Sequence, residues 1–175
     1  MQHERGLAAD RDHEARRLAT RLRQAIYRIV ENLPSADQSI VEQYARAISV
    51  DAAQFQGQPL TDRFPFPLRP HRGNPDADAT SYANPLFVLG FHIGNAIRVV
   101  HEFALGRDDR HRDARINRVL EIADNGPLRD NWRVWGEPRH GYYLVTCDEY
   151  AKLATQAAEA AAQTEADTER RITGD

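Results

Sequence analysis

Apolar side chains recur every three or four residues over two N-terminal stretches, a spacing that is typical of amphipathic helices. The first stretch, residues 10–33, carries one continuous apolar stripe and ends at Pro34, which disfavours a helical residue before it. The second stretch opens at Ser35, and Gln38 stands three positions later, which is the spacing of a capping box. The pattern therefore predicts a helical hairpin over residues 1–53.

A third stretch, residues 85–105, is apolar on nearly every side, and such a helix is typical of the centre of a domain. It opens with an asparagine and a proline, which suit the N-cap and the first helical position. Gly90 and Gly94 lie on one face, where a second helix can approach closely. We expect this helix to be the least accessible element, with Phe91 and Ile97 in the core.

Shorter patterns follow in the C-terminal half of the chain. A helix is predicted over residues 110–124, and it ends at an Asn-Gly-Pro run. Strand-forming residues then occupy 132–135 and 142–145, on either side of a charged turn flanked by two glycines, so this stretch predicts a β-hairpin. A capping box at 146–149 opens a last, alanine-rich helix, which we expect to fray beyond Thr164.

Residues 54–84 interrupt these patterns. Five prolines exclude a long helix, whereas several aromatic and aliphatic side chains make the segment too apolar for a simple linker. We expect an extended arm, partly in polyproline geometry, that lies over the helices. Phe64, Phe66 and Leu68 are its candidate partner-binding residues; the alternative is that they pack as a strap onto the protein's own core.

Together these patterns predict a mainly α fold, a bundle of about five helices with one β-hairpin. A chain of 175 residues is long enough for a single core of this kind. We expect one domain, made of an N-terminal helical hairpin (1–53), a proline-rich arm (54–84) and the core helices with the hairpin and the C-terminal helix (85–163). Residues 164–175 are expected to form a flexible tail.

The charge balance narrows the choice of partner. The chain has 23 basic and 26 acidic residues and a net charge of −3, which argues against coating nucleic acid by bulk attraction but leaves room for a local basic patch. The single cysteine, Cys147, cannot form an internal disulfide and fits a reducing cytoplasm. Charged N-terminal residues predict no secretory signal, and the longest apolar run is too polar to span a membrane.

Two adjoining segments carry a pattern of helix, turn, hairpin and helix. RINRVLEIADNGPL gives a helix and a Gly-Pro turn, and WRVWGEPRHGYYLVTCDEYAKLA gives a hairpin and the acidic start of the next helix. Over residues 115–153 this order resembles the winged-helix modules of phage and prophage DNA-binding proteins. The resemblance implies a winged-helix-like C-terminal part with a wing that contacts nucleic acid. The chain departs from the family between the Gly-Pro turn and the hairpin, where residues 128–131 are too few to form the recognition helix that reads bases.

Basic residues around this wing are candidate nucleic-acid contacts. Without a recognition helix, the resemblance leaves contacts to the sugar-phosphate backbone. The candidates are Arg129, Arg133, Arg139 and His140. The alternative is that the hairpin only covers one end of a helical bundle, with Trp132 and Trp135 packed beneath it. If the wing does not bind nucleic acid, the exposed hairpin is a candidate surface for a protein partner, and Trp135 is its candidate contact.

Three arginines of the first helix form a second basic candidate. Arg17, Arg21 and Arg28 share one flank of that helix, so they could grip phosphates together. The alternative is a solvated face on which arginine stems cover apolar surface, and interleaved acidic residues dilute the positive field there.

No combination of residues predicts catalysis or a bound metal. His92 and His101 lie on opposite faces of one helix, so they cannot share a metal ion within it. Cys147 and His140 could pair across the hairpin as nucleophile and base, but no orienting acid accompanies them, and a small half-buried cysteine is favoured. We therefore expect no catalytic residue, no metal and no cofactor.

Two functions fit these observations. The first is a non-enzymatic, nucleic-acid-associated regulatory protein of phage or mobile-element origin, which binds through the basic wing and the arginine-lined helix. The second is a protein-binding adaptor or inhibitor that retains a winged-helix remnant only as a scaffold. The wing and its arginines favour the first by a small margin, whereas the near-neutral charge and the missing recognition helix favour the second. Either protein is expected to be cytoplasmic, with no membrane partner, and a homo-oligomer is left open.

Overall fold

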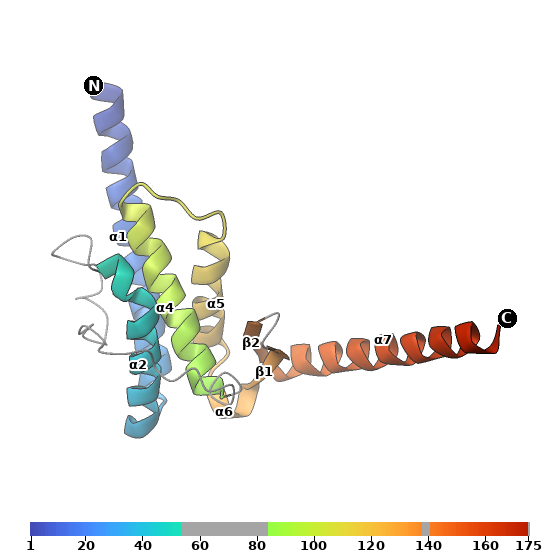
Figure 1. Cartoon of the computed structure of the whole chain (residues 1–175). Helices are drawn as coiled ribbons and strands as arrows, with labels where there is room; N and C mark the ends of the chain where they lie inside the picture. Colours follow the sequence, from blue (N-terminus) through green and yellow to red (C-terminus); the bar gives the residue numbers. More distant parts are fainter. Residues whose placement is uncertain (54–83, 138–140, 175) are drawn as a thin grey trace.

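The computed structural model describes residues 1–53, 84–137 and 141–174, and Figure 1 shows their course. The described chain is mainly helical with a single two-stranded antiparallel sheet, which confirms the predicted fold class. The predicted arm lies outside the described residues, apart from its last residue. The elements in chain order are α1 (Gln2–Glu31), α2 (Ser35–Ala53), α4 (Pro85–Ala104), α5 (Arg112–Asp124), α6 (Leu128–Asn131), β1 (Trp132–Glu137), β2 (Gly141–Thr146) and α7 (Cys147–Thr173).

α1 buries the apolar stripe that the sequence predicts, but it begins at Gln2 and not at residue 10. Its first turns bury no side chain, and Leu7 is 53% exposed. The hydrophobic pattern could not reveal these turns, because they add nothing to the buried stripe. In Figure 1 they rise beyond the other helices of the bundle as a free N-terminal end.

The junction between α1 and α2 differs from the predicted capping box. The side-chain amide of Gln38 donates hydrogen bonds to the carbonyl groups of Val30 and Leu33, at 3.0 and 2.9 Å. These carbonyls belong to the end of α1, where backbone acceptors lack helical partners. Gln38 therefore caps the end of α1 and not the start of α2.

α4 lies at the centre of the bundle and packs against α1, α2 and α5 (Figure 1). Ten of its residues are buried, including Leu89, Ile93 and Ile97. Phe91 is 39% exposed, so its predicted place in the core was wrong. The sequence shows α4 as apolar all round, but its three neighbouring helices do not enclose every side of it.

The two glycines of α4 mark its closest approach to α2. A methyl group built on Gly90 would lie 2.6 Å from Cβ of Tyr44 and 2.8 Å from the carbonyl oxygen of Val41. A methyl group on Gly94 would lie 2.8 Å from the carbonyl oxygen of Ala45. All three distances are shorter than those that real Cβ atoms show. The predicted close packing at these glycines is therefore confirmed, and its partner is α2.

The one-turn helix α6 and the hairpin close one end of the bundle. The segment between the Gly-Pro turn and β1 forms only this single turn, as its length predicts. In the hairpin, Trp132 pairs with Thr146 and Val134 with Leu144. Trp132 and Leu144 are 1% and 0% exposed, so this face of the hairpin joins the main core.

α7 leaves the hairpin and points away from the helical bundle (Figure 1). Its predicted capping box is confirmed: Thr146 and Glu149 each bind the backbone N–H of the other, at 3.2 and 3.0 Å. The helix continues to Thr173 and does not end near Thr164, where fraying was predicted. None of its 27 residues is buried. Its alanine-rich sequence has a high intrinsic helix propensity, which sustains the helix without tertiary packing.

Candidate interaction surfaces

The hairpin presents one face to the core, and its other face is partly exposed to solvent. Side chains alternate along a strand, so Arg133 and Trp135 lie opposite to the buried Trp132. Trp135 pairs across the strands with Tyr143, and its ring centre lies 5.4 Å from that of Tyr150 at the start of α7. Tyr143 and Tyr150 are 48% and 38% exposed. We call Trp135, Tyr143 and Tyr150 the hairpin aromatic cluster.

Arg133 is exposed beside this cluster. One of its guanidinium nitrogens donates to the carbonyl oxygen of Trp132 at 2.8 Å. Of the four predicted wing contacts, only Arg133 has a described side chain. Arg139 and His140 lie outside the described residues, and for Arg129 the structure describes the backbone only. The predicted arm residues Phe64, Phe66 and Leu68 also lie outside the described chain.

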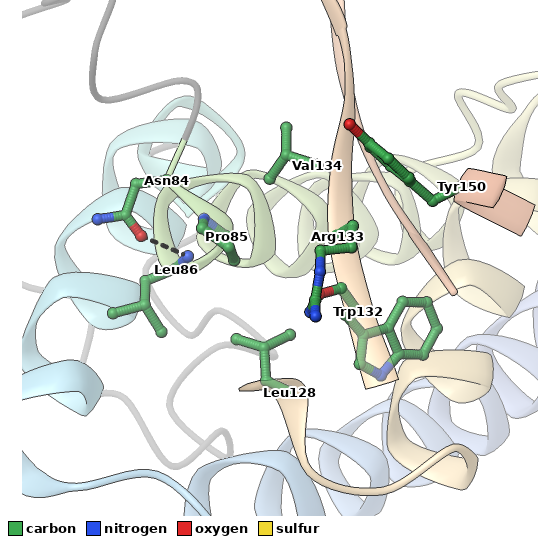
Figure 2. A pocket seen from close by; sticks show the side chains of 8 residues that line it. All are labelled: Asn84, Pro85, Leu86, Leu128, Trp132, Arg133, Val134 and Tyr150. Carbon is green, nitrogen blue, oxygen red and sulfur yellow. Dashed lines mark hydrogen bonds between the residues drawn. The ribbon is translucent and has the colours of Figure 1, made fainter. Parts of the chain in front are cut away.

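A hollow of about 510 Å³ lies where the hairpin meets the start of α4 (Figure 2). At its rim the side-chain oxygen of Asn84 accepts a hydrogen bond from the backbone N–H of Leu86 at 2.9 Å, which caps α4. The indole nitrogen of Trp132 is buried and has no hydrogen-bond partner among the described residues. The full lining is Asn84, Pro85, Leu86, Leu128, Trp132, Arg133, Val134 and Tyr150.

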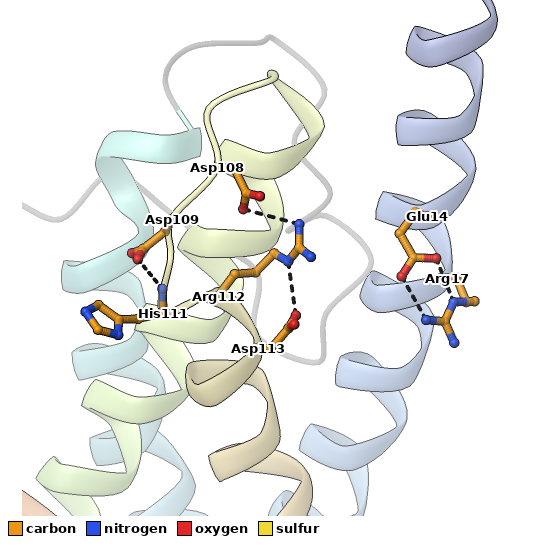
Figure 3. Close-up of polar contacts among 7 residues, drawn as sticks. All are labelled: Glu14, Arg17, Asp108, Asp109, His111, Arg112 and Asp113. Atoms are coloured by element: carbon orange, nitrogen blue, oxygen red, sulfur yellow. Dashed lines mark hydrogen bonds and ion pairs between the residues drawn. The ribbon is translucent and has the colours of Figure 1, made fainter.

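The predicted arginine row of α1 is largely neutralised. Arg17 donates two hydrogen bonds to Glu14, both at 2.8 Å (Figure 3), and this contact lowers the pKa of Glu14. Arg28 forms an ion pair with Asp124 of α5 at 3.0 Å. Arg21 has no hydrogen bond or ion pair with any residue that the structure describes. The row is therefore not a continuous positive surface.

Arg21 and Arg28 share a second hollow, of about 500 Å³, on the surface between α1 and α5. We call it the α1–α5 hollow. Sequence reasoning named the two arginines but missed the neutral residues between them. The sequence could have indicated these residues, because Gln24 and Tyr27 lie outside the apolar stripe of this helix. The lining is Arg21, Gln24, Tyr27, Arg28, Leu120 and Asp124.

Charged side chains also hold the loop that leads into α5 (Figure 3). Arg112 donates to Asp108 and to Asp113, at 3.2 Å in each case. Asp109 accepts a hydrogen bond from the backbone N–H of His111 at 2.8 Å, and this bond lowers the pKa of Asp109. Asp109 also forms an ion pair with Arg115 at 3.4 Å, so each of these three carboxylates has a basic partner within the described residues.

The two histidines of α4 have different environments. Nε2 of His92 accepts a hydrogen bond from the backbone N–H of Leu144 at 3.3 Å, which ties α4 to β2. Burial, and secondarily the positive charge of Arg118, lowers the pKa of His92 to about 4. His101 is 2% exposed, and neither of its ring nitrogens has a hydrogen-bond partner within the described chain. Of the two histidines, only His92 therefore has a hydrogen-bond partner for its ring among the described residues.

Cys147 is half-buried at the start of α7. Its thiol donates to the carbonyl oxygen of Asp130 at 3.5 Å. Its predicted alternative partner, His140, lies outside the described residues. Across residues 1–53, 84–137 and 141–174, no three His, Cys, Asp or Glu side chains gather in a way that could hold a metal ion.

α7 adds a surface that the sequence analysis did not name as a candidate site. One side of the helix carries Tyr150, Ala154, Ala157 and Ala161, and the opposite side carries Lys152, Gln156, Glu159 and Gln163. Six carboxylates and three basic side chains give α7 a net charge of −3. The helix is therefore amphipathic and acidic, and its apolar side continues from the hairpin aromatic cluster.

In the described part of the chain, no helix combines the length and the apolar character that crossing a membrane requires. Comparisons with protein-family models, with curated proteins and with solved structures found no match to this chain. The resemblance to winged-helix modules therefore stays a prediction.

Proposed function

We propose that the protein is a non-enzymatic adaptor or inhibitor that binds a protein partner through α7 and the hairpin aromatic cluster. The observation that carries this proposal is the exposure of α7: 27 helical residues, about 40 Å in length, bury no side chain. An amphipathic helix with free apolar positions at spacings of three and four residues suits docking into a groove on another protein. The hairpin would then act as a scaffold that orients this helix.

The aromatic cluster extends the proposed surface to the base of α7. Tyrosine and tryptophan supply large contact areas at low entropic cost, and such residues dominate the binding energy of many interfaces. Trp135 lies against Tyr150, so its ring is already oriented before binding. Partners that offer an apolar groove with a basic rim would complement the net charge of −3 on α7.

The sharpest test uses two neighbouring positions on opposite sides of α7. Ala157→Arg places a charge on the apolar side, and Gln156→Arg places the same charge on the polar side. Both residues are exposed, so both variants should fold like the wild type. We expect a partner captured from a native host lysate to be retained by Gln156→Arg and lost by Ala157→Arg, with or without nuclease. Equal capture by both variants contradicts the proposal.

The second candidate is the nucleic-acid-associated regulatory protein of phage or mobile-element origin. The observation that favours it is Arg133, which is exposed beside the aromatic cluster, since single strands bind surfaces that combine cations with aromatic rings. Two observations weaken it: two of the three helix-one arginines are paired with carboxylates, and acidic α7 adjoins the hairpin.

A fluorescence titration against duplex and single-stranded DNA at several salt concentrations tests this candidate. If the hairpin binds nucleic acid, Arg133→Ala should weaken binding and reduce the slope of log affinity against log salt by about one. Arg171→Ala, near the far end of α7, removes the same charge away from the hairpin and serves as the control. Absence of binding at low salt refutes this candidate and leaves the adaptor.

A further inference from the structure

We propose that the α1–α5 hollow binds a nucleotide-like ligand, meaning a flat ring that carries a phosphate group. Its volume of about 500 Å³ falls within the roughly 300–1,000 Å³ that small-molecule pockets occupy. The walls come from residues 21–28 of α1 and from the last turns of α5. No residue of the hairpin or of α7 lines the hollow, so the proposal is independent of the adaptor function.

Arg21 supplies the group that would hold the phosphate. Its guanidinium has no hydrogen bond or ion pair with any described residue, whereas Arg28 on the same wall is paired with Asp124 at 3.0 Å. Two arginines and one aspartate give the lining a net charge of +1. A guanidinium presents parallel N–H donors that match two phosphate oxygens, so Arg21 is suited to hold a phosphate in a bidentate contact.

Tyr27 and Gln24 supply the features that would hold the ring. Tyr27 is 47% exposed, and it forms no hydrogen bond or aromatic ring contact with any residue that the structure describes. An exposed aromatic face can stack on a planar ring, and stacking of this kind is tolerant of the identity of the base. The amide of Gln24 offers both a donor and an acceptor to the edge of a base. Leu120, which is half-buried, adds apolar surface from α5.

The same chemistry occurs in a free mononucleotide and in one nucleotide of a single strand. A titration of isotope-labelled full-length protein, followed by amide chemical shifts, can use AMP and a short oligo(dA) as the two probes. Adenosine and ribose 5-phosphate separate the ring from the phosphate. We expect AMP to shift the amides of residues 21–28 and of Leu120, and each half-molecule to bind at least about tenfold more weakly than AMP.

Variants then assign the binding to individual side chains. Arg21→Ala should raise the dissociation constant for AMP at least about tenfold, because a charge-assisted contact is lost. Tyr27→Ala should weaken AMP and adenosine alike. Arg5→Ala, on the exposed first turns of α1, removes the same charge and should change nothing. Because these residues are exposed, the folded state should be retained in every variant.

The two ligand sources give different outcomes. Tighter binding of oligo(dA) than of AMP, lost in Arg21→Ala, assigns the hollow to a nucleic-acid strand; tighter binding of AMP assigns it to a free nucleotide. The proposal is overturned if neither probe shifts these amides at about 10 mM, or if Arg21→Ala binds as tightly as the wild type. Either failure leaves the α7 experiment unaffected, because that experiment reads out a different surface.

Discussion

Acidification should loosen the junction between α4 and the hairpin, because His92 binds the hairpin only in its neutral form. Nε2 of His92 accepts a hydrogen bond from the backbone N–H of Leu144, and a protonated imidazole has no acceptor left. The surroundings also disfavour the charge, since burial and then the nearby Arg118 lower the pKa of His92 from 6.5 to about 4.

The sign of the effect follows from proton binding. The unfolded chain takes up a proton on His92 near pH 6.5, whereas the folded protein does so only near pH 4. Between these two pH values the unfolded state binds more protons than the folded state. The free energy of unfolding therefore has its full value above pH 6.5 and decreases as the pH falls towards 4. The difference between the two pKa values corresponds to a loss of at most about 3 kcal/mol.

Urea unfolding at a series of pH values from about 7.5 to 4, followed by tryptophan fluorescence, measures this loss. His92→Gln is the matched control, because the glutamine carbonyl can accept from the Leu144 N–H but does not titrate. Over this pH range, the decrease in the free energy of unfolding should be smaller in the variant than in the wild type, by up to about 3 kcal/mol. The pKa of His101 is also lowered by burial, but His101 is present in both proteins, so its contribution to the pH dependence cancels in the comparison. Equal losses in the two proteins refute the reasoning.

Three further predictions concern stability. Gly90→Ala puts a methyl group against α2 and should lower the free energy of unfolding by about 1–3 kcal/mol; Gly6→Ala, where nothing lies within 4 Å, should not, and urea midpoints compare the two. Ile97→Ala should cost about 2–5 kcal/mol and Phe91→Ala clearly less, and equal costs would place Phe91 in the core after all. Thr146→Ala removes the α7 capping box and should cost about 0.5–2 kcal/mol, with a loss of helical circular dichroism; an unchanged spectrum and midpoint would contradict this.

The elements with strong local signals were predictable from the sequence. The buried stripe of α1, the Asn84–Pro85 start of α4, the hairpin and the Thr146–Glu149 capping box each depend on residues that are close together in the chain. The close approach of α4 was also predictable from Gly90 and Gly94. Its partner was not, because the choice of α2 depends on how distant segments meet.

The predictions were wrong where the structure depends on which surfaces are covered by distant segments, and not on the periodicity of apolar residues. Phe91 follows the apolar pattern of α4, but whether a neighbour covers it depends on the arrangement of the bundle. The exposed first turns of α1 and the last turns of α7 are helical but bury no side chain, so the hydrophobic pattern does not predict them. The pairing of Arg28 with Asp124 joins residues far apart in the chain, and no local pattern predicts it.

The isolation of α7 also sets how its backbone exchanges hydrogen with water. Amides of α4 lie in the core and become accessible mainly when the whole domain opens, whereas a helix that buries no residue can unwind by itself. Helix–coil relaxation takes only about 0.1–1 μs, so the distal amides of α7 should be among the first to exchange. A groove that captured the helix would suppress this unwinding. Slowed hydrogen exchange confined to α7 would therefore show that the partner's groove is occupied, even where binding does not change the structure of the helical bundle.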